Sequence, residues 1–354
     1  MEPSVTTARC EIVVAPRTVD EAAQVIRHAT EHGFSILPIG SGSTMREPRS
    51  NIALSTSSMA GVIEYQPDDL TIVVGAGMSI GDLEDVLADR GHSAVLPESS
   101  PSRTVGGVVA SGASGYARLR YGPTRDRVLE VTMATGYGDV VRAGGRLVKN
   151  VTGYDLSRLA TGSFGSLGVI GSVCLKLWPM APASRTVRVD NAGSALDRLY
   201  RPVAILETGE GVSAYVHGSV ATVESDVALL GGTAVEGFDW PCHDQPPVYA
   251  EVRVPARMID DALVRVREID PLWFVGQHGV GIVEFGLSAH DDAVLESLRL
   301  WAQGLGGSVV VTAPGLSSRQ RWGSPGNTIE LQQRMKHLFD PEGILNRGVL
   351  PGGV

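Results

Sequence analysis

The sequence predicts an α+β protein built from two parts. The chain has 354 residues, which is more than a single hydrophobic core usually organises. It opens with a strand–helix–strand pattern, and its glycines are concentrated between Gly40 and Gly171. Beyond the proline-rich stretch 179–183 the pattern changes to strands and helices in alternation. We therefore expect a domain boundary at this stretch.

The elements expected in the first part are periodic or apolar runs that end at turn residues. The expected helices are Ala22–Ala29, closed by Gly33, Ile80–Arg90, closed by Gly91, and Tyr154–Leu159. The expected strands are Glu11–Ala15, Ser35–Ile39, Ile52–Ser55, Val62–Gln66, Thr71–Val74, the hairpin Val128–Ala134 with Asp139–Arg142, and Val169–Trp178.

The second part is expected to form an antiparallel sheet with helices on one face, because strands and helices alternate there with short connections. The expected strands are Thr186–Asp190, Val203–Glu207, Val212–His217, Val248–Val254, Trp273–Gly276, Gly281–Leu287 and Ser308–Thr312. The expected helices are Ala192–Leu199, Val220–Leu230, Met258–Ile269 and Ala293–Gly304, followed by Thr328–Phe339 near the end of the chain.

Charge and composition argue against several classes of protein. The net charge of −9 is unlike that of a general nucleic-acid binder and disfavours docking to anionic lipid. No segment approaches the ~20 apolar residues of a membrane helix, and the first ten residues lack the pattern of a signal peptide. Cys10, Cys174 and Cys242 lie far apart without metal-ligand spacing. We expect reduced thiols, no metal site and a cytoplasmic protein.

Three glycine-rich stretches point to a large ligand that carries a diphosphate. The loop Pro38–Thr44 follows a strand and offers successive backbone N–H groups, which bind anions. Thr104–Gly115 contains almost no bulky polar side chain, and an Arg125–Asp126 ion pair is expected to fix the loop that follows it. The third stretch is Gly162–Gly171. Small residues let the backbone approach a ligand closely, so one large ligand would use all three.

Four motifs in this order resemble the vanillyl-alcohol-oxidase-type (PCMH-type) FAD-binding family. They are Pro38…Gly42-Ser43-Thr44, Thr104-Val105-Gly106-Gly107, Tyr121-Gly122-x-x-Arg125-Asp126 and Gly165-x-x-Gly168-Val169-Ile170. The closing run 339–346, which ends in Ile344-Leu345-Asn346, is similar to the family's return to the flavin domain, although Arg347 stands where proline is common. The resemblance covers about the first half and the last twenty residues.

The resemblance implies an FAD-binding domain of two α/β subdomains and a smaller antiparallel-sheet cap. Its limits would be 1–182 for the FAD domain, 183–327 for the cap and 328–354 for the returning segment. The residues expected to bind FAD are Pro38, Gly40, Ser41, Gly42, Ser43, Thr44, Pro97, Thr104, Gly106, Gly107, Ser111, Gly112, Ser114, Gly115, Tyr121, Gly122, Arg125, Lys149, Asn150, Gly153, Tyr154, Gly165, Gly168, Val169, Ile170 and Asn346. Because 97–135 holds no His or Cys and the first loop offers only Ser41, Ser43 and Thr44, the cofactor is expected to be noncovalent.

A narrower resemblance rests on the run Val148-Lys149-Asn150-Val151-Thr152-Gly153-Tyr154-Asp155. It is similar to the FAD-binding E subunits of bacterial glycolate oxidases, and Arg321-Trp322-Gly323 fits them too. This resemblance implies oxidation of a 2-hydroxy acid such as glycolate or D-lactate by hydride transfer to FAD. It also implies a partner flavoprotein subunit and an iron–sulfur subunit. Two alternatives stay open: a non-catalytic FAD-carrying or assembly subunit, and a stand-alone flavin oxidase of another alcohol.

Such a reaction needs an anchor for the substrate carboxylate and a base for its hydroxyl proton. Related dehydrogenases carry His-x-Gly-Asp-Gly-Asn-x-His, which can hold a metal, and this chain lacks it. The nearest stretch is 277–281, so His278 is the candidate base, with a loop residue beside a glycine turn as the alternative. Arg321 and Trp322 are expected in a loop before the last helix, as a lid with an anion anchor or as surface residues, and the neighbouring Arg319 is a further candidate anchor.

Overall fold

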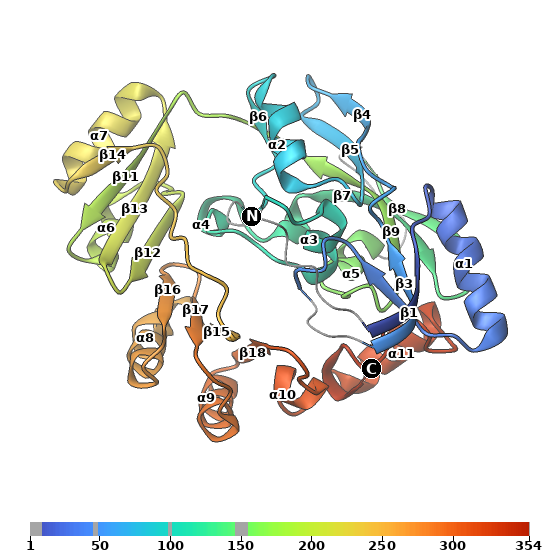
Figure 1. Ribbon diagram of the computed structural model, residues 1–354. Coiled ribbons are helices and arrows are strands. Elements are labelled where there is room, and N and C mark those ends of the chain that lie inside the picture. Colours follow the sequence, from blue (N-terminus) through green and yellow to red (C-terminus); the bar gives the residue numbers. More distant parts are fainter. Residues whose placement is uncertain (1–8, 45–48, 98–100, 146–154, 354) are drawn as a thin grey trace. The chain divides into compact units, whose positions relative to one another are not determined.

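The computed structural model describes residues 9–44, 49–97, 101–145 and 155–353. Within it the chain folds into two compact units (Figure 1). Unit 1 comprises residues 1–114, 123–179 and 324–354, and unit 2 comprises residues 115–122 and 180–323. Unit 2 therefore includes the short segment 115–122 from the first half of the chain. The functional domain limits at 182 and 327 stay a prediction.

Unit 1 begins with a small parallel sheet in the order β1 (Arg9–Val14), β3 (Arg49–Ser55), β2 (Ile36–Ile39). Helix α1 (Val19–His32) connects β1 to β2, as the opening pattern predicts. The Thr18 hydroxyl accepts the Glu21 N–H at its start, and Gly33 ends it in the left-handed region at φ 70°. The face with Ala22, Ile26 and Ala29 is buried in the core of this sheet.

The second sheet of unit 1 is antiparallel and has β9 (Gly168–Lys176) at its centre. The order is β4 (Val62–Gln66), β5 (Thr71–Gly75), β9, β7 (Val128–Thr135), β8 (Val140–Gly144). Two short strands, β6 (His92–Ser93) and β10 (Trp178–Pro179), pair separately. The helical elements here are α2 (Ile80–Ala88), α3 (Val105–Ser111), α5 (Leu156–Ala160) and a short 3-10 turn at Thr124–Asp126.

The last segment of the chain returns to unit 1. After α11 (Ile329–Phe339), Leu345 forms a parallel bridge with Ile36 of β2, and the Ile36 N–H donates to Ile344 O at 2.8 Å. A final 3-10 turn covers Pro351–Gly353. The first and last parts of the sequence therefore share the core that holds Ile36, Ile344 and Leu345.

Unit 2 is an eight-stranded antiparallel sheet in the order β14-β11-β13-β12-β16-β17-β15-β18. The strands are β11 (Ala183–Val189), β12 (Ala204–Thr208), β13 (Gly211–Gly218), β14 (Ala234–Glu236), β15 (Val248–Arg253), β16 (Trp273–Gln277), β17 (Ile282–Leu287) and β18 (Ser308–Thr312). The helices are α4 (Arg118–Tyr121), α6 (Ala192–Arg198), α7 (Val220–Leu230), a 3-10 turn at Ala256–Met258, α8 (Ile259–Glu268), α9 (Asp292–Gly304) and α10 (Ser318–Trp322).

Helices α6 to α9 pack on one face of this sheet, as Figure 1 lets the reader follow. Alternate strand residues such as Val252, Val283 and Phe285 point into that core, which Leu263 and Leu295 of the helices complete. The strand residues between them face the other side. The expected antiparallel sheet with helices on one face is thus observed.

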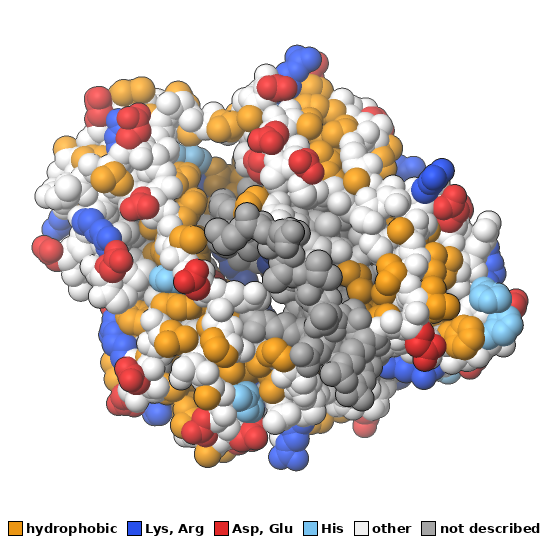
Figure 2. Space-filling model, viewed as in Figure 1, with side chains coloured by type: hydrophobic (Ala, Val, Ile, Leu, Met, Phe, Trp, Pro, Cys, Tyr) orange, Lys and Arg blue, Asp and Glu red, His pale blue; other side chains and the backbone are white. Residues whose placement is uncertain are grey.

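Two stretches contain short helices that the sequence did not predict. The stretch Thr104–Gly115 is largely the helix α3, because Thr104 caps it and Val105, Val108 and Val109 are buried. Arg321 and Trp322 end the short helix α10, which a capping box between Ser317 and Gln320 begins. In the described part of the chain, no helix is long and apolar enough to cross a bilayer. On the face that Figure 2 shows, acidic and basic side chains are interspersed.

Candidate functional site

Three of the predicted segments meet at the end of β2. A Cβ on Gly40 would overlap the Thr104 hydroxyl, so the first loop lies directly against the start of α3. A Cβ on Gly165 would come 3.1 Å from Pro38 Cγ, which places the third glycine stretch beside the same loop. Segments that are far apart in the sequence are thus in contact, and only glycine permits this spacing.

The glycines of α3 also serve the packing of unit 1. The Gly106 N–H donates to Ala76 O at 2.8 Å, and a Cβ on Gly106 would lie 2.6 Å from Ala76 Cβ. The Gly107 N–H donates to the Thr104 hydroxyl at 3.2 Å. The close packing against Ala76 therefore explains why position 106 is glycine, even without a ligand. The sequence alone did not reveal this packing.

We call the place where these three segments meet the junction. Arg103 supplies a cation there that the sequence pattern did not indicate. Its Nη2 donates to Thr44 Oγ1 at 3.3 Å and to Ser111 Oγ at 2.9 Å, two residues that were predicted to bind the cofactor. The Ser41 hydroxyl donates to Ser43 at 3.3 Å in the same loop. The sequence feature that could have identified Arg103 is its position directly before Thr104, where the second motif begins.

The C-terminal tail completes the junction. The Asn346 N–H donates to Ile36 O at 2.7 Å, and its side-chain amide donates to Phe164 O in the third glycine stretch. Asn346 itself is buried and takes a positive φ of 43°. Asn346 therefore joins β2 to the third glycine stretch within unit 1.

A buried ion pair, also missed, fastens the tail. Lys336 Nζ donates to Asp340 at 2.6 Å, to Ser166 O at 2.8 Å and to Leu345 O at 2.6 Å. Asp340 accepts the N–H groups of Ile344 and Leu345 at 3.1 and 2.8 Å. Burial lowers the pKa of Lys336, and the Asp340 carboxylate opposes that shift. This pair joins α11, the third glycine stretch and the tail.

The remaining predicted cofactor residues have varied surroundings. Gly112 ends α3 at φ 66°, Gly168 begins β9, and the side chains of Val169 and Ile170 pack in cores. The Ser114 hydroxyl accepts the Thr124 N–H at 3.1 Å. Pro97 and Arg125 lie in unit 1, whereas Gly115, Tyr121 and Gly122 belong to unit 2. Lys149, Asn150, Gly153 and Tyr154 lie outside the described residues.

The expected ion pair between Arg125 and Asp126 is replaced by another. Asp126 pairs with Arg158 of α5 at 3.1 Å, and Arg158 also pairs with Asp155 at the start of that helix. These groups are about half exposed, so the contacts contribute little stability.

The candidate base His278 lies in the turn directly after β16 and is buried. It is 4% exposed, and its Nε2 lies 2.7 Å from Glu207, which also pairs with Arg267 of α8. The bond to His278 is the main cause that lowers the pKa of Glu207, although burial opposes it. Of the other candidates, Arg321 is buried in unit 2 at the end of α10, next to Trp322. These roles stay predictions.

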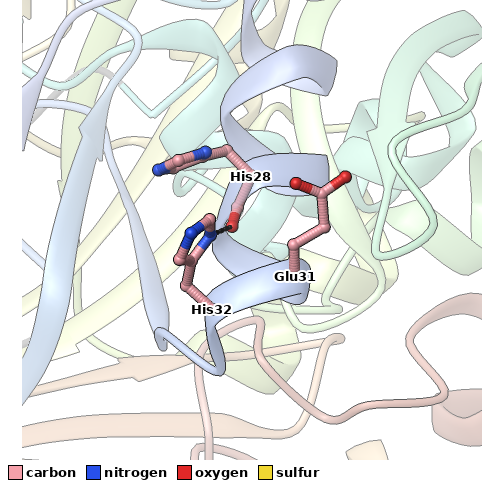
Figure 3. Close-up of side chains that lie close together, drawn as sticks. All are labelled: His28, Glu31 and His32. Carbon is pink, nitrogen blue, oxygen red and sulfur yellow. Dashed lines mark hydrogen bonds between the residues drawn. The ribbon is translucent and has the colours of Figure 1, made fainter.

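One group in the described part of the chain has the composition of a metal site (Figure 3). His28, Glu31 and His32 lie one turn apart on the exposed side of α1, with their ligand atoms within 4.8 Å of one another. His32 Nδ1 lies 2.9 Å from His28 O. The group belongs to a different face of α1 from the buried Ala22, Ile26 and Ala29. The expectation of no metal stays a prediction.

The junction in unit 1 fits a dinucleotide diphosphate. The first loop has no side-chain bulk at Gly40 and Gly42, and it carries the hydroxyl groups of Ser41, Ser43 and Thr44. The guanidinium of Arg103 lies at the end of this loop, beside Thr44. Backbone N–H groups, hydroxyls and arginine are the donors that phosphate oxygens take.

A family model described as FAD binding domain matches residues 10–144. The chain contains an FAD binding domain. FAD is therefore its cofactor. The match includes the first loop, Arg103 and α3, whereas the third glycine stretch and Asn346 lie beyond it.

Two curated relatives are glycolate oxidase subunits. The chain is 32% identical over 182 residues to glycolate oxidase subunit GlcD of Bacillus subtilis (strain 168), covering 50% of this chain and 39% of that subunit. It is 27% identical over 326 residues to subunit GlcE of Escherichia coli (strain K12), covering 85% of this chain and 87% of that one. The chain thus spans well under half of the first relative's length. Both kinds of subunit match, so the similarity alone does not choose between them.

A solved structure supports the fold. An alkyldihydroxyacetonephosphate synthase superposes with a TM-score of 0.66 at 18% identity, covering 97% of this chain and 77% of that one. At this identity the likeness shows the fold alone. The expected fold class is confirmed: an α+β protein with a vanillyl-alcohol-oxidase-type FAD-binding domain and an antiparallel-sheet part.

Proposed function

We propose that this chain is an FAD-dependent oxidoreductase that oxidises a 2-hydroxy acid such as glycolate or D-lactate. The observation that carries the proposal is the junction in its FAD-binding domain, where Gly40 meets Thr104, Pro38 meets Gly165 and Asn346 bonds to Phe164. When bound, FAD accepts a hydride from the carbon that carries the hydroxyl group.

The residues at the junction have distinct roles in this proposal. The loop Gly40–Thr44 and Arg103 hold the diphosphate, because they combine backbone N–H groups with a cation. Gly165 and Asn346 shape the wall on the other side of the loop. The first loop offers hydroxyls but no His or Cys for a covalent link, so the cofactor is held noncovalently.

The glycolate oxidase relatives and the run 148–155 support a place in a multisubunit oxidase, with this chain in the role of the E subunit. Electrons then pass from the flavin to a partner flavoprotein or iron–sulfur subunit. The chain's three cysteines are far apart in sequence, so an iron–sulfur centre belongs to a partner. We place the complex in the cytoplasm.

A second candidate is an FAD-carrying subunit without substrate turnover of its own. It is favoured by the missing His-x-Gly-Asp-Gly-Asn-x-His run and by the pairing of His278 with Glu207. A stand-alone flavin oxidase of another alcohol is the third candidate.

Anaerobic addition of glycolate and D-lactate to the purified FAD-loaded chain separates these candidates. We expect loss of the flavin's visible absorbance with at least one of them. Bound FAD that neither acid reduces would favour the carrier subunit. Reduction by simple alcohols but by neither hydroxy acid would favour the stand-alone oxidase.

A further inference from the structure

Helix α1 carries three neighbouring side chains that can share one ligand, and we call His28, Glu31 and His32 the α1 group (Figure 3). All three are exposed, and their possible ligand atoms lie within 4.8 Å of one another. Side chains four positions apart, such as the two histidines, stand one above the other on a helix. The whole group belongs to one helix of unit 1, so its geometry is set by that helix alone.

The His32 ring is held with one nitrogen available to a ligand. Its Nδ1 donates to the His28 carbonyl oxygen at 2.9 Å. A carbonyl oxygen only accepts, so the neutral ring carries its proton on Nδ1 and its lone pair on Nε2. Histidines that bind metal ions usually donate their other ring N–H in this way, which fixes the orientation of the ring. The Phe34 ring stacks beside it, with ring centroids 5.9 Å apart.

His28 and Glu31 supply the other two donor atoms. The rings of His28 and His32 lie side by side, with their centroids 4.2 Å apart and their planes at 37°. The Glu31 carboxylate adds a negative charge that attracts a cation. The neighbouring Arg27 is directed elsewhere, because its guanidinium donates to Gly138 O between β7 and β8. The α1 group thus combines two imidazoles with one carboxylate.

Helix α1 is a fixed frame for these side chains. Thr18 caps its start and Gly33 caps its end, and the face that contains Ile26 is buried in the core. His32 is the last residue of the helix, where the helix dipole favours a positive charge. Ligand atoms about 2.0–2.2 Å from a tetrahedral ion are about 3.3 Å apart, and exposed side chains reach this spacing by small rotations.

This set of ligands selects the kind of metal ion. Zn²⁺ takes histidine nitrogen and glutamate oxygen, and two histidines four positions apart on a helix are a recurrent zinc-binding pair. Mg²⁺ and Ca²⁺ prefer oxygen ligands, so one carboxylate offers them little. The expectation of no metal site rests on the spacing of the three cysteines, none of which belongs to the α1 group.

We propose that His28, Glu31 and His32 bind one Zn²⁺ ion on the exposed side of α1, with water at the remaining position. The ion joins the side chains of two successive turns at the end of α1, directly before the chain enters β2. Because the unfolded chain does not hold the three groups together, the bound ion stabilises the folded state. None of the three residues takes part in the junction, so the inference is independent of the proposed function.

The test is Zn²⁺ binding to the full FAD-loaded chain, prepared without a histidine tag and treated with a chelator that is then removed. Calorimetric titration with Zn²⁺ gives affinity and stoichiometry, and Mg²⁺ is the comparison ion. The variants are His28→Gln and His32→Gln. His337→Gln is the matched control, because His337 is an exposed histidine in the last turn of another helix of unit 1, α11. FAD content and circular dichroism show that each variant is folded.

We expect one Zn²⁺ ion per wild-type chain and no binding of Mg²⁺ at the same concentration. His28→Gln and His32→Gln should each lower the Zn²⁺ affinity at least about tenfold, whereas His337→Gln binds like the wild type. Saturating Zn²⁺ should raise the unfolding temperature of the wild type and of His337→Gln more than that of the two α1 variants.

A wild-type chain that binds no Zn²⁺ overturns the site. Binding that survives unchanged in both α1 variants, or that His337→Gln weakens equally, also overturns it, because the ion is then held elsewhere. Each of these results leaves the proposed function standing, since no 2-hydroxy acid enters the measurement.

Discussion

Lys336 joins three segments of unit 1 through its ammonium group. Its ammonium bonds to Asp340, Ser166 O and Leu345 O, and the Asp340 side chain is fully buried. A buried ion pair adds little net stability when complete, because desolvation offsets the attraction. Removing one partner is different, because the other charge then stays buried alone.

Lys336→Met should therefore destabilise unit 1 by about 3–5 kcal/mol and lower its FAD content. Chemical unfolding followed by flavin fluorescence measures both effects. Lys176→Met is the matched control, because Lys176 is exposed on β9 and its contact with Trp178 contributes less than about 1 kcal/mol. Equal stability of the two variants would show that the pair does not hold the tail.

Glu284 makes the stability of unit 2 depend on pH. Burial, and then the charge of Glu251 on the neighbouring strand β15, raise the pKa of the Glu284 carboxyl group to about 7 in the folded chain. Between its usual value and about 7 the folded chain therefore binds more protons than the unfolded chain. Stability therefore falls as pH rises through that window, by up to about 3 kcal/mol. Glu284→Gln should unfold at a temperature that changes less between pH 5 and pH 8 than the wild type does. Parallel curves for the two proteins would contradict this.

At the residue scale the sequence identified candidate residues but not the contacts that they make. The stretch 277–281 is the part of the chain nearest to the histidine-rich run of related dehydrogenases, whose histidines are seven positions apart. Gln277 and Glu284 have that separation, and the register brings both to one face, whereas His278 is bound to Glu207. Sequence alone cannot show this, because the turn at Gly279 and Gly281 decides which residues share a face.

At the scale of elements, periodicity predicted most helices and strands. The limits of α7 and β18 agree with those expected, because clear turn residues bound them. Helix α3 escaped prediction because Gly106 and Gly107 are poor helix formers. The Thr104 cap and the burial of Val105 and Val108 outweigh that preference, and both depend on contacts with distant residues.

Thr104→Val should accordingly cost about 1 kcal/mol, because the Gly107 N–H loses its acceptor. FAD affinity should fall as well, since the same hydroxyl lies against Gly40 of the first loop. Thermal unfolding and FAD titration measure the two effects. Thr104→Ser keeps the hydroxyl and should behave like the wild type; a Ser variant as weak as the Val variant would rule out the cap as the cause.

At the scale of the molecule, the FAD-binding domain is assembled from segments at both ends of the sequence. The segments 38–44, 103–111, 162–168 and 340–346 meet through Thr104, Pro38, Lys336 and Asn346. The order of the motifs predicted that they belong together. The contacts of Arg103 with Thr44 and of Lys336 with Ser166 O link residues far apart in the sequence, so they appear only in the fold.

FAD binding should therefore slow amide hydrogen exchange in all four segments at once, relative to the FAD-free chain. The exposed strand β14 serves as the internal reference, because Ala234–Glu236 lies in unit 2 at the edge of its sheet. Protection limited to the first loop would mean that the third glycine stretch and the tail serve the fold and not the cofactor.

The central claim, an FAD held noncovalently by this junction, is tested most directly by denaturing the purified chain with acid and measuring flavin in the supernatant and in the pellet. We expect about one FAD per chain, all of it in the supernatant. Flavin that stays with the precipitated polypeptide, or a colourless chain that takes up no added FAD before denaturation, would contradict it.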